Sequence, residues 1–359
     1  MPSVKRIGVL TGGGDSPGIN AAIRAIVRRA EPAGLAVVGF RDGWRGAVED
    51  DLVPLGRSEV AGILHIGGTI LGTSRTNPYE KDPATGTWTP TPKVDRILDT
   101  LNRRRVDAVL AIGGDDTLGV AHRLASHGVR AVGIPQTIDN DIGGTDYAIG
   151  FHSALAVVTE ALDRLHTTAH AHHRVLIVEV MGRDAGWIAV LGGLAGGADV
   201  ILAPEEPFSV PQVEEALQWR LDAGRRFSII VVAEGARPLE LGSRPVAEEA
   251  RTDAFGHAQL GGVGYWLAAE LEKTGLPLTP RVTVLSYLQR GGGATPFDRL
   301  LATRLGVAAV ELACAGQYDA MVGFHGTDVG PVPLAAALAG CPKPVPREYL
   351  ELARNIGVR

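Results

Sequence analysis

The sequence has little of several features that mark particular classes of protein. Only two cysteines, Cys314 and Cys341, occur in 359 residues, so we expect no disulfide framework and a reducing compartment. No apolar run approaches the roughly 18 residues that span a bilayer. The first residues lead into an apolar run without a signal-peptide layout. We therefore expect a cytoplasmic protein that contacts no membrane.

The chain also lacks a large excess of either sign of charge. Against 35 lysines and arginines stand 40 aspartates and glutamates, which gives a net charge of −5. A nucleic-acid-binding protein usually carries a basic surplus, so we expect no nucleic-acid partner. The motif GxxxxGK[ST] is absent as well, which excludes a Walker-type phosphate loop.

What the chain does contain is an alternation of short apolar runs with longer amphipathic segments. The apolar runs are RIGVLT, LAVVGF, VDAVLAI, VRAVGIP, RVLIVEV, FSIIVVAEG, RVTVLS and YDAMVGF. Continuous runs of this kind are typical of strands buried on both faces, and the alternation predicts parallel α/β sheets. Residues 76–92 and 236–256 break the rhythm and are expected to form surface loops.

Functional groups in parallel α/β folds gather where the strands end. The first run is followed by TGGGDSPGIN, whose glycines Gly13 and Gly14 would let backbone amides approach a phosphate at a helix N-terminus. Taken alone, the same loop is also explained as a turn that only reverses the chain. The third run is followed by GGDDT, with adjacent carboxylates on Asp115 and Asp116. Mg²⁺ between Asp115 and a phosphate would make one of them compatible with such a loop, and Asp116 would serve as a helix N-cap.

The next strand end carries QTIDNDIGGTD. Asp139 and Asp141 are two residues apart, which in an extended segment places them on one side. Transfer of a phosphoryl group to an alcohol needs an acceptor for the hydroxyl proton, and aspartate does this in kinases. An Asx turn explains the same residues without chemistry.

Four arginines are predicted at strand ends: Arg174, Arg183, Arg281 and Arg290. Guanidinium groups that converge would suit a phosphorylated substrate, because each holds phosphate oxygens with a planar fork. Single arginines at such positions are usually surface charges, so this hypothesis depends on their convergence.

The motifs together resemble those of the phosphofructokinase family. The segments IGVLTGGGDSPGINAAIR, GGTILGTSR, IGGDDT, PQTIDNDI, VEVMGRDAGWIA, VVAEG and LQRGG occur in the order found in that family, over about residues 7–305. The long form GGTILGTSRTNP is similar to a bacterial group with both ATP-dependent and pyrophosphate-dependent members. The implied fold is α/β, with two Rossmann-like parallel-sheet domains and the active site in the cleft between them.

The resemblance also implies domain limits and an assembly. Residues 1–150 and about 289–335 would bind the phosphoryl donor and Mg²⁺, and about 151–288 with the C-terminal helices in 336–359 would bind the sugar phosphate. The implied protein is a homo-oligomer with an active site shared between subunits.

The implied reaction transfers a phosphoryl group to the 1-hydroxyl of fructose 6-phosphate. By motif, Asp139 would be the base, Asp115 the Mg²⁺ ligand, and Gly13 and Gly14 the donor-phosphate contacts. Arg174 and Arg281 would reach the sugar phosphate of a neighbouring subunit. The implied substrate-binding set is Thr137, Ile138, Asp139, Arg174, Met181, Gly182, Arg183, Glu234, Arg281, Tyr287, Leu288, Gln289 and Arg290.

Asp116 and Gln136 bear on the donor. ATP-using members resemble GGDG, and a carboxylate at that glycine would oppose the α-phosphate of ATP. Two like charges about 4 Å apart at an effective dielectric near 20 repel by about 4 kcal/mol, so Asp116 favours pyrophosphate. Pyrophosphate-dependent members resemble PKTIDND, and Gln136 replaces that lysine with a neutral group that offers only a neutral hydrogen bond. Tyr287 likewise departs from a more usual histidine.

Four other interpretations remain open. An ATP-dependent 6-phosphofructokinase is one, although ATP-using members resemble GGDG where this chain has Asp116 and often have glycine at the position of Gln136. NAD kinases and lipid kinases have similar GGDG loops but lack PxTIDND and MGR together, and a nicotinamide-dependent oxidoreductase would explain only the first loop. A sugar-phosphate-binding paralogue without activity is compatible with Gln136 and Tyr287, whereas the presence of Asp115 and Asp139 argues against it.

Overall fold

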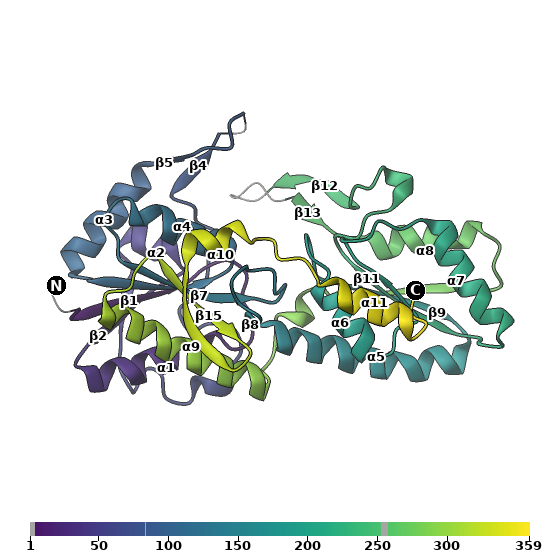
Figure 1. Cartoon of the computed structure of the whole chain (residues 1–359), viewed down its shortest axis with the longest axis horizontal. Helices are drawn as coiled ribbons and strands as arrows, with labels where there is room; N and C mark the ends of the chain where they lie inside the picture. The colour runs from purple at the N-terminus through teal and green to yellow at the C-terminus, as the bar shows by residue number, and fades with distance from the viewer. Residues whose placement is uncertain (1–3, 83, 253–257) are drawn as a thin grey trace. The chain divides into compact units, whose positions relative to one another are not determined.

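The computed structural model describes residues 4–82, 84–252 and 258–359. The chain divides into two compact units, each built on its own sheet (Figure 1). The first unit contains the residues up to Ser153 together with Arg290–Cys341. The second contains Ala154–Thr252, Ala258–Gln289 and Pro342–Arg359.

The first unit is an α/β sandwich around an eight-stranded sheet in the order β16-β15-β7-β6-β1-β2-β3, with β8 paired to β7. Its strands are β1 (Arg6–Thr11), β2 (Ala36–Phe40), β3 (Leu52–Leu55), β6 (Ala108–Gly113), β7 (Ala131–Thr137), β8 (Ile149–Gly150), β15 (Ala320–His325) and β16 (Asp328–Pro333). The pairs from β2 through β15 are parallel, as the apolar runs predict. The edge strands β3 and β16 pair antiparallel and contain prolines, which a sheet tolerates at its edges.

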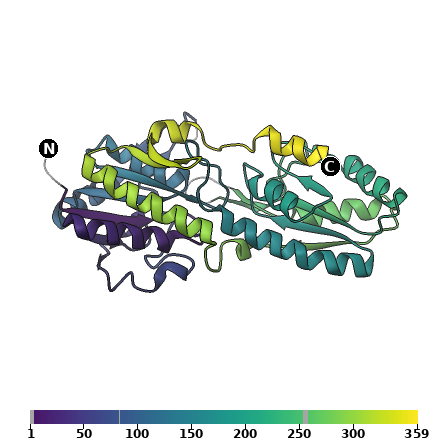
Figure 2. The ribbon, with the colours of Figure 1, turned by 60° about the horizontal axis from the view of Figure 1, so that its bottom comes forward.

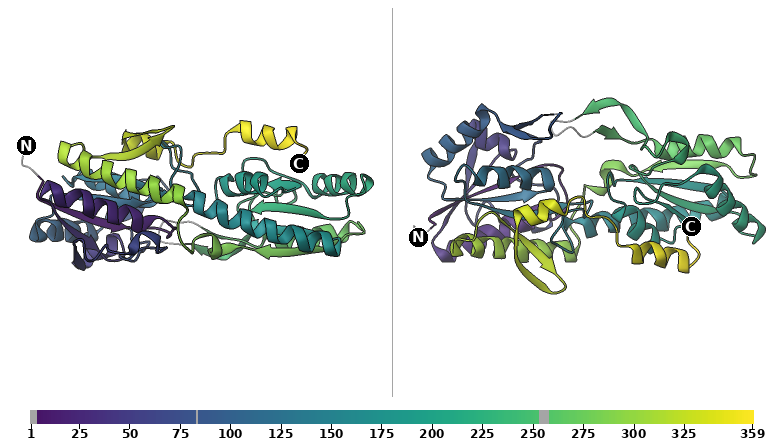
Figure 3. Two further views of the ribbon diagram at one scale, coloured as in Figure 1. Left: turned by 90° about the horizontal axis from the view of Figure 1, so that it is seen from below. Right: turned by 45° about the horizontal axis from the view of Figure 1, so that its top comes forward.

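Helices cover both faces of this sheet. They are α1 (Ile19–Ala30), α2 (Trp44–Glu49), α3 (Pro92–Arg104), α4 (Asp115–Ala125), α9 (Pro296–Ala315) and α10 (Leu334–Ala339). Figure 2 and Figure 3 show α1 and α9 side by side on one face, where Gly306 lets the two helices approach closely. Helices α3, α4 and α10 bury their apolar residues in the cluster on the other face.

The second unit has a four-stranded parallel sheet in the order β10-β11-β9-β14. Its strands are β9 (Val175–Val180), β10 (Val200–Leu202), β11 (Ser228–Ala233) and β14 (Pro280–Val284), with a separate pair β12 (Ala247–Thr252) and β13 (Ala258–Leu260). Its helices are α5 (Phe151–His172), α6 (Trp187–Ala195), α7 (Val210–Asp222), α8 (Val263–Lys273) and α11 (Arg347–Asn355). Helix α7 begins at a capping box between Ser209 and Gln212, with Pro211 in its first turn.

The apolar runs and the amphipathic segments thus form the strands and helices expected of them, and the α/β class with two Rossmann-like units is confirmed. Two details differ. Residues 76–92 do not form only a loop, because β4 (Tyr79–Lys81) and β5 (Trp88–Pro90) pair as a hairpin. Helix α10 belongs to the first unit rather than the second, because Leu334 and Ala337 are fully buried in its core.

The segment 236–256, expected to be a loop, contains a 3-10 turn at Leu239–Leu241 and the strand β12. Residues 253–256 of it lie outside the described part of the chain. None of the helices in the described ranges is both long and apolar enough to cross a membrane.

Candidate active site

Three loops of the first unit follow the neighbouring parallel strands β1, β6 and β7. They therefore lie together where the strands end, along the C-terminal edge of the sheet. They carry the glycines of the first loop, the two adjacent aspartates and the TIDND segment. Helices α1 and α4 begin at this edge, so their N-terminal partial charges reinforce one another there. An anion such as a phosphate is therefore favoured at this edge.

Gly13 and Gly14 of the first loop are each needed for a different structural reason. Gly13 has φ 83°, and its amide donates to the Ser74 carbonyl at 3.1 Å, so this amide is already used. A Cβ on Gly14 would lie 2.5 Å from Nη1 of Arg290, which donates to the Asp15 carbonyl at 3.2 Å. Gly13 thus shapes the loop, whereas Gly14 leaves space for a guanidinium beside it. Arg290, expected among the sugar-phosphate contacts, lies against the donor loop.

The adjacent aspartates open α4. The N-cap is Gly114, which makes no side-chain cap bond, and Asp115 and Asp116 are the first two residues of the helix. The N-cap hypothesis for Asp116 is therefore wrong. Asp115 is exposed and Asp116 is half-buried. Both carboxylates stand in the first turn, where a helix stabilises negative charge.

Asp115 fits a magnesium ion that arrives with a phosphorylated donor. Such an ion takes one or two carboxylates and completes its shell with phosphate oxygens and water. Among the described residues no group of three His, Cys, Asp or Glu side chains is placed to hold a metal alone. An exposed carboxylate beside an anion-binding loop meets the first requirement without a dedicated cage.

Gln136 is buried at 1% exposure and has a different role from the one expected. Its amide nitrogen donates to the Gly14 carbonyl at 3.2 Å and to Ser16 Oγ at 2.9 Å. Both N–H groups are thereby used on the first loop, so none remains for a transferring phosphoryl group. The expectation of a neutral hydrogen bond to that group is wrong, and Gln136 instead ties the donor loop to β7.

The TIDND segment is not extended. Asn140 has φ 51°, its Oδ1 accepts from the Ala148 amide at 2.9 Å and its Nδ2 donates to the Asp146 carbonyl at 3.1 Å. This turn removes the argument that placed Asp139 and Asp141 on one side of a strand. Sequence reasoning missed Asn140 as the residue that fixes the turn, although asparagine tolerates a left-handed backbone.

The neighbouring members of that segment differ in exposure. Asp139 is half-buried, with its amide bonded to Thr137 Oγ1 at 3.1 Å, whereas the Ile138 side chain is fully buried. Asp139 and Thr137 can present side chains to a ligand, and Ile138 only its backbone.

In the second unit, the MGR segment follows β9. Met181 donates its amide to Oε1 of Gln289 at 3.2 Å, and Gln289 Nε2 donates to the Ser286 carbonyl at 3.1 Å. Gln289 is fully buried, so its side chain holds the MGR loop and, like Ile138, it can offer a substrate only its backbone. Tyr287 and Leu288 beside it are exposed.

Glu234 follows β11, next to β9, and its amide donates to the Val180 carbonyl at 2.8 Å. A Cβ on Gly235 would lie 1.8 Å from the Arg183 carbonyl, so this glycine lets the two loops meet. The Gly182 backbone has φ 137°. Arg183 is half-buried, and within the described ranges its Nε has no hydrogen-bond partner. At the C-terminal edge of this sheet, the loops that carry Glu234 and Arg183 are thus in backbone contact.

Glu205 is a second positioning residue that no motif indicated. Its carboxylate accepts from the Gly186 amide at 2.9 Å and from the Val345 amide at 3.0 Å. It thereby fastens the end of the MGRDAG loop to the C-terminal segment. Only the structure brings these three residues together, because 140 positions separate Glu205 from Val345.

Three of the four arginines lie in the second unit, at two opposite ends of its sheet. Arg174 precedes β9 and Arg281 pairs beside Leu176 at the start of β14, whereas Arg183 follows the end of β9. The six residues of β9 extend about 20 Å at roughly 3.3 Å each, so opposite edges of one sheet separate these groups. Arg290 belongs to the first unit. Within the second unit, Arg174 and Arg281 thus lie apart from Arg183, and the convergence of all four arginines stays a prediction.

Comparisons with known proteins agree with these motifs. The phosphofructokinase family model matches residues 6–313. A relative from Amycolatopsis methanolica, named pyrophosphate–fructose 6-phosphate 1-phosphotransferase, is 52% identical over 348 residues, 96% of this chain and 98% of its own. An ATP-dependent 6-phosphofructokinase of Spirochaeta thermophila is 43% identical over 361 residues, 99% of this chain and 97% of its own.

A solved structure is similar as well. The pyrophosphate-dependent phosphofructokinase of Marinobacter aquaeolei matches with a TM-score of 0.77 and 25% identity, over 96% of this chain and 86% of that one. The family model covers most of the sequence, and the relatives match nearly its whole length. The chain belongs to the phosphofructokinase family.

Proposed function

We propose that the protein transfers a phosphoryl group from pyrophosphate to the 1-hydroxyl of fructose 6-phosphate. The observation that carries the choice of donor is Asp116, whose carboxylate stands in the first turn of α4 at the anion-binding edge. Relatives that are 51–52% identical and named for pyrophosphate support the same donor. Relatives named ATP-dependent are 43–46% identical, so ATP is the second candidate donor.

The chemistry follows from the charges. The 1-hydroxyl oxygen forms a bond to the terminal phosphorus of pyrophosphate, its proton passes to the Asp139 carboxylate, and the broken P–O bond leaves its electron pair on orthophosphate. The products are fructose 1,6-bisphosphate and orthophosphate. Little covalent work falls to the protein in such a transfer, and positioning and charge neutralisation dominate.

The donor is held by the first loop, the helix N-termini and Arg290. The Gly14 amide and the guanidinium of Arg290 address its phosphates, and Gln136 keeps the loop in place. Mg²⁺, held by Asp115, would supply further neutralisation of phosphate charge. The acceptor sugar is addressed by Arg183 and Glu234, because a guanidinium and a carboxylate suit a phosphate and hydroxyl groups.

Arg174 and Arg281 act on the sugar phosphate of a neighbouring copy of the chain. Their place at the opposite sheet edge from Arg183 and Glu234 supports this part of the proposal. The active form is then a homo-oligomer in which each site needs residues from two subunits.

The donor is tested with purified protein, Mg²⁺ and fructose 6-phosphate, supplied with pyrophosphate or with ATP. Fructose 1,6-bisphosphate should form with pyrophosphate and at least about 30-fold more slowly with ATP, since a repulsion of about 2 kcal/mol corresponds to that factor. Equal or faster turnover with ATP would refute the donor assignment. No product with either donor, together with tight binding of fructose 6-phosphate, would instead support the inactive paralogue.

The shared site is tested by complementation. Asp139→Asn and Arg174→Ala should each be inactive alone, because one lacks the base and the other a phosphate contact. Mixed subunits should recover activity, because some sites then receive Asp139 from one subunit and Arg174 from another. A mixture of the Asp139→Asn protein with Glu234→Ala serves as control, since both residues belong to the same site and no site regains both. Failure of the first mixture to exceed the second would refute sharing.

A further inference from the structure

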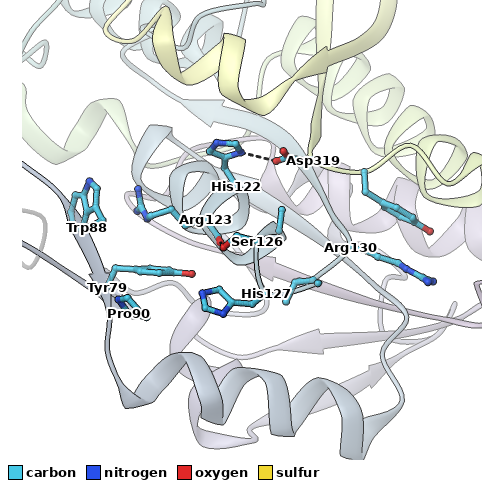
Figure 4. Close-up of a pocket in the computed structure, with 13 residues that line it drawn as sticks. Tyr79, Trp88, Pro90, His122, Arg123, Ser126, His127, Arg130 and Asp319 are labelled. Carbon is cyan, nitrogen blue, oxygen red and sulfur yellow. Dashed lines mark hydrogen bonds and ion pairs between the residues drawn. The ribbon is translucent and has the colours of Figure 1, made fainter.

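A hollow of about 820 Å³ lies on the first unit (Figure 4), and its lining includes no residue of the three loops described above. It is bounded by the β4–β5 hairpin, the C-terminal end of α4 and the segment that enters β7, and we call it the hairpin hollow. The side chains that matter are Tyr79, Trp88, His122, Arg123, His127 and Arg130. Its volume lies in the range of small-molecule sites in proteins.

Arg123 is held at one end of the hairpin hollow by two aromatic rings. Its guanidinium carbon lies 4.5 Å from the ring centre of Trp88 and 5.1 Å from that of Tyr79. Both distances are within cation–π range. The side chain also runs back over Gly119, where a Cβ would lie 3.3 Å from Nη1. The cation is therefore fixed in position rather than mobile in solvent.

The same guanidinium is incompletely satisfied. Its Nε is buried and has no hydrogen-bond partner in the part of the chain that the structure describes, and the Tyr79 hydroxyl is in the same condition. Burial lowers the pKa of Arg123, which attraction to Tyr79 and Asp116 only partly opposes. A buried cation of this kind is stabilised by an anion that brings hydrogen-bond acceptors.

The surrounding charges are also suited to an anion. His127 lies beside Tyr79, with ring centroids 6.4 Å apart, and Arg130 stands at the other end of the hollow next to Tyr318 (Figure 4). The one carboxylate among the residues that line the hollow belongs to Asp319, which is bound to Nδ1 of His122 at 2.7 Å. Aromatic walls and fixed cations suit a phosphate group, with or without a planar ring attached.

The hairpin hollow is separate from the donor loop. Asp115 and Asp116 begin α4, whereas Arg123 and the residues after it end the helix. Asp116 and Arg123 are seven residues apart, which is about 10 Å along the helix axis at roughly 1.5 Å per residue. No residue of the first loop lines the hollow, and neither do Asp115 and Asp116, so the hollow is not the place proposed for pyrophosphate.

We propose that the hairpin hollow is a second anion site, which binds a small phosphate-bearing molecule through the stacked guanidinium of Arg123, with Tyr79 and His127 beside it. The group that this site would recognise is phosphate, either as free orthophosphate or as part of a nucleoside monophosphate. Arg123 gives two N–H groups on one edge to phosphate oxygens, and Trp88 reports on occupancy because it lies against that guanidinium.

The test follows the indole N–H resonance of Trp88 in the full-length protein by NMR. This resonance is assigned by its disappearance in Trp88→Phe. Sodium phosphate and adenosine 5′-monophosphate are titrated separately at constant ionic strength, so the tighter probe identifies the source of the phosphate. No turnover is measured, and a failure of the proposed reaction leaves this result unaffected.

Wild-type protein should show a saturable shift of the Trp88 resonance. Arg123→Lys keeps the charge but loses the planar fork, so it should weaken binding at least tenfold. Arg164→Lys, at an exposed arginine on α5, is the matched control and should titrate like the wild type. His127→Gln, at an exposed position, should weaken binding about threefold. If Arg123→Lys does not fold, the titration of His127→Gln tests the proposal in its place. The absence of a saturable shift with both probes, or equal titrations of the wild type and these two variants, would overturn the proposal.

Discussion

Removing the carboxylate of Asp116 should move donor preference from pyrophosphate toward ATP. Asp116 is the second residue of α4, half-buried at the edge that carries the donor loop. Two like charges 4 Å apart repel by about 4 kcal/mol at an effective dielectric of 20 and by about 1 kcal/mol in bulk water. A half-buried group lies between these limits, and attraction to Arg123 offsets part of its charge. We therefore expect about 2 kcal/mol, or about 30-fold in the ATP-to-pyrophosphate ratio of kcat/KM.

Two variants separate charge from size. Asp116→Asn removes the charge and keeps the volume, whereas Asp116→Gly removes both. If repulsion dominates, Asn should give most of the change; if the side chain fills the space of the α-phosphate, only Gly should. Glycine in the first turn costs about 1 kcal/mol of helix stability, so thermal unfolding of both variants is measured alongside.

The assay is initial rate of fructose 1,6-bisphosphate formation with each donor at saturating fructose 6-phosphate. The ratio of the two donors cancels losses from partial unfolding, since both reactions use the same folded fraction. An unchanged ratio in both Asp116→Asn and Asp116→Gly would refute the electrostatic argument for the donor.

Three further changes test the supporting residues. Gln136→Leu removes the bonds to Gly14 and Ser16, so the KM for the donor should rise about tenfold while fructose 6-phosphate binding, measured by calorimetry, stays the same. Gln289→Met leaves the Met181 amide without its acceptor, so the free energy of unfolding in urea should fall by about 1–2 kcal/mol. Asp298 is fully buried and its pKa is raised by burial, against hydrogen bonds that lower it. Its contribution to stability is thus complete below its ordinary pKa of 3.8 and is lost as pH rises through the folded value; Asp298→Asn should flatten this fall in unfolding titrations above pH 4, and an equal slope would contradict it.

The buried strands and the helices between them were predictable because their patterns are local. A strand covered on both faces needs a continuous apolar run, and a capped helix needs residues such as Ser209 and Pro211 at fixed spacing. The hairpin β4–β5 could not be predicted in this way, because its three-residue strands contain no continuous apolar run. Helix α10 was placed in the wrong unit because a boundary depends on which core its apolar residues join, here that of Leu118 and Met321.

The site residues also divide into those that a local sequence pattern predicts and those whose role depends on distant contacts. The aspartates and glycines could be predicted from the sequence, because loops that bind phosphate and magnesium need these residue types. The role of a glutamine, in contrast, depends on what it contacts. Gln136 and Gln289 both belong to motifs, and both prove to be buried and bonded to a loop. Glu205 belongs to none, because its partners come from two distant parts of the chain.

The arginines show how topology decides whether residues of one charge form one site. In a parallel sheet all strands run the same way, so a residue before a strand and a residue after it must lie at opposite edges. Arg174 and Arg183 flank β9 in this manner, and Arg281 joins Arg174 through the register of β14. The second unit therefore has cations at both ends of its sheet, while Asp139, the carboxylate that we propose as the base, is on the first unit. In the homo-oligomer that we propose, Arg174 and Arg281 would bind the sugar phosphate of a neighbouring copy, and this is why we expect mixed subunits, rather than any single variant, to reveal their function.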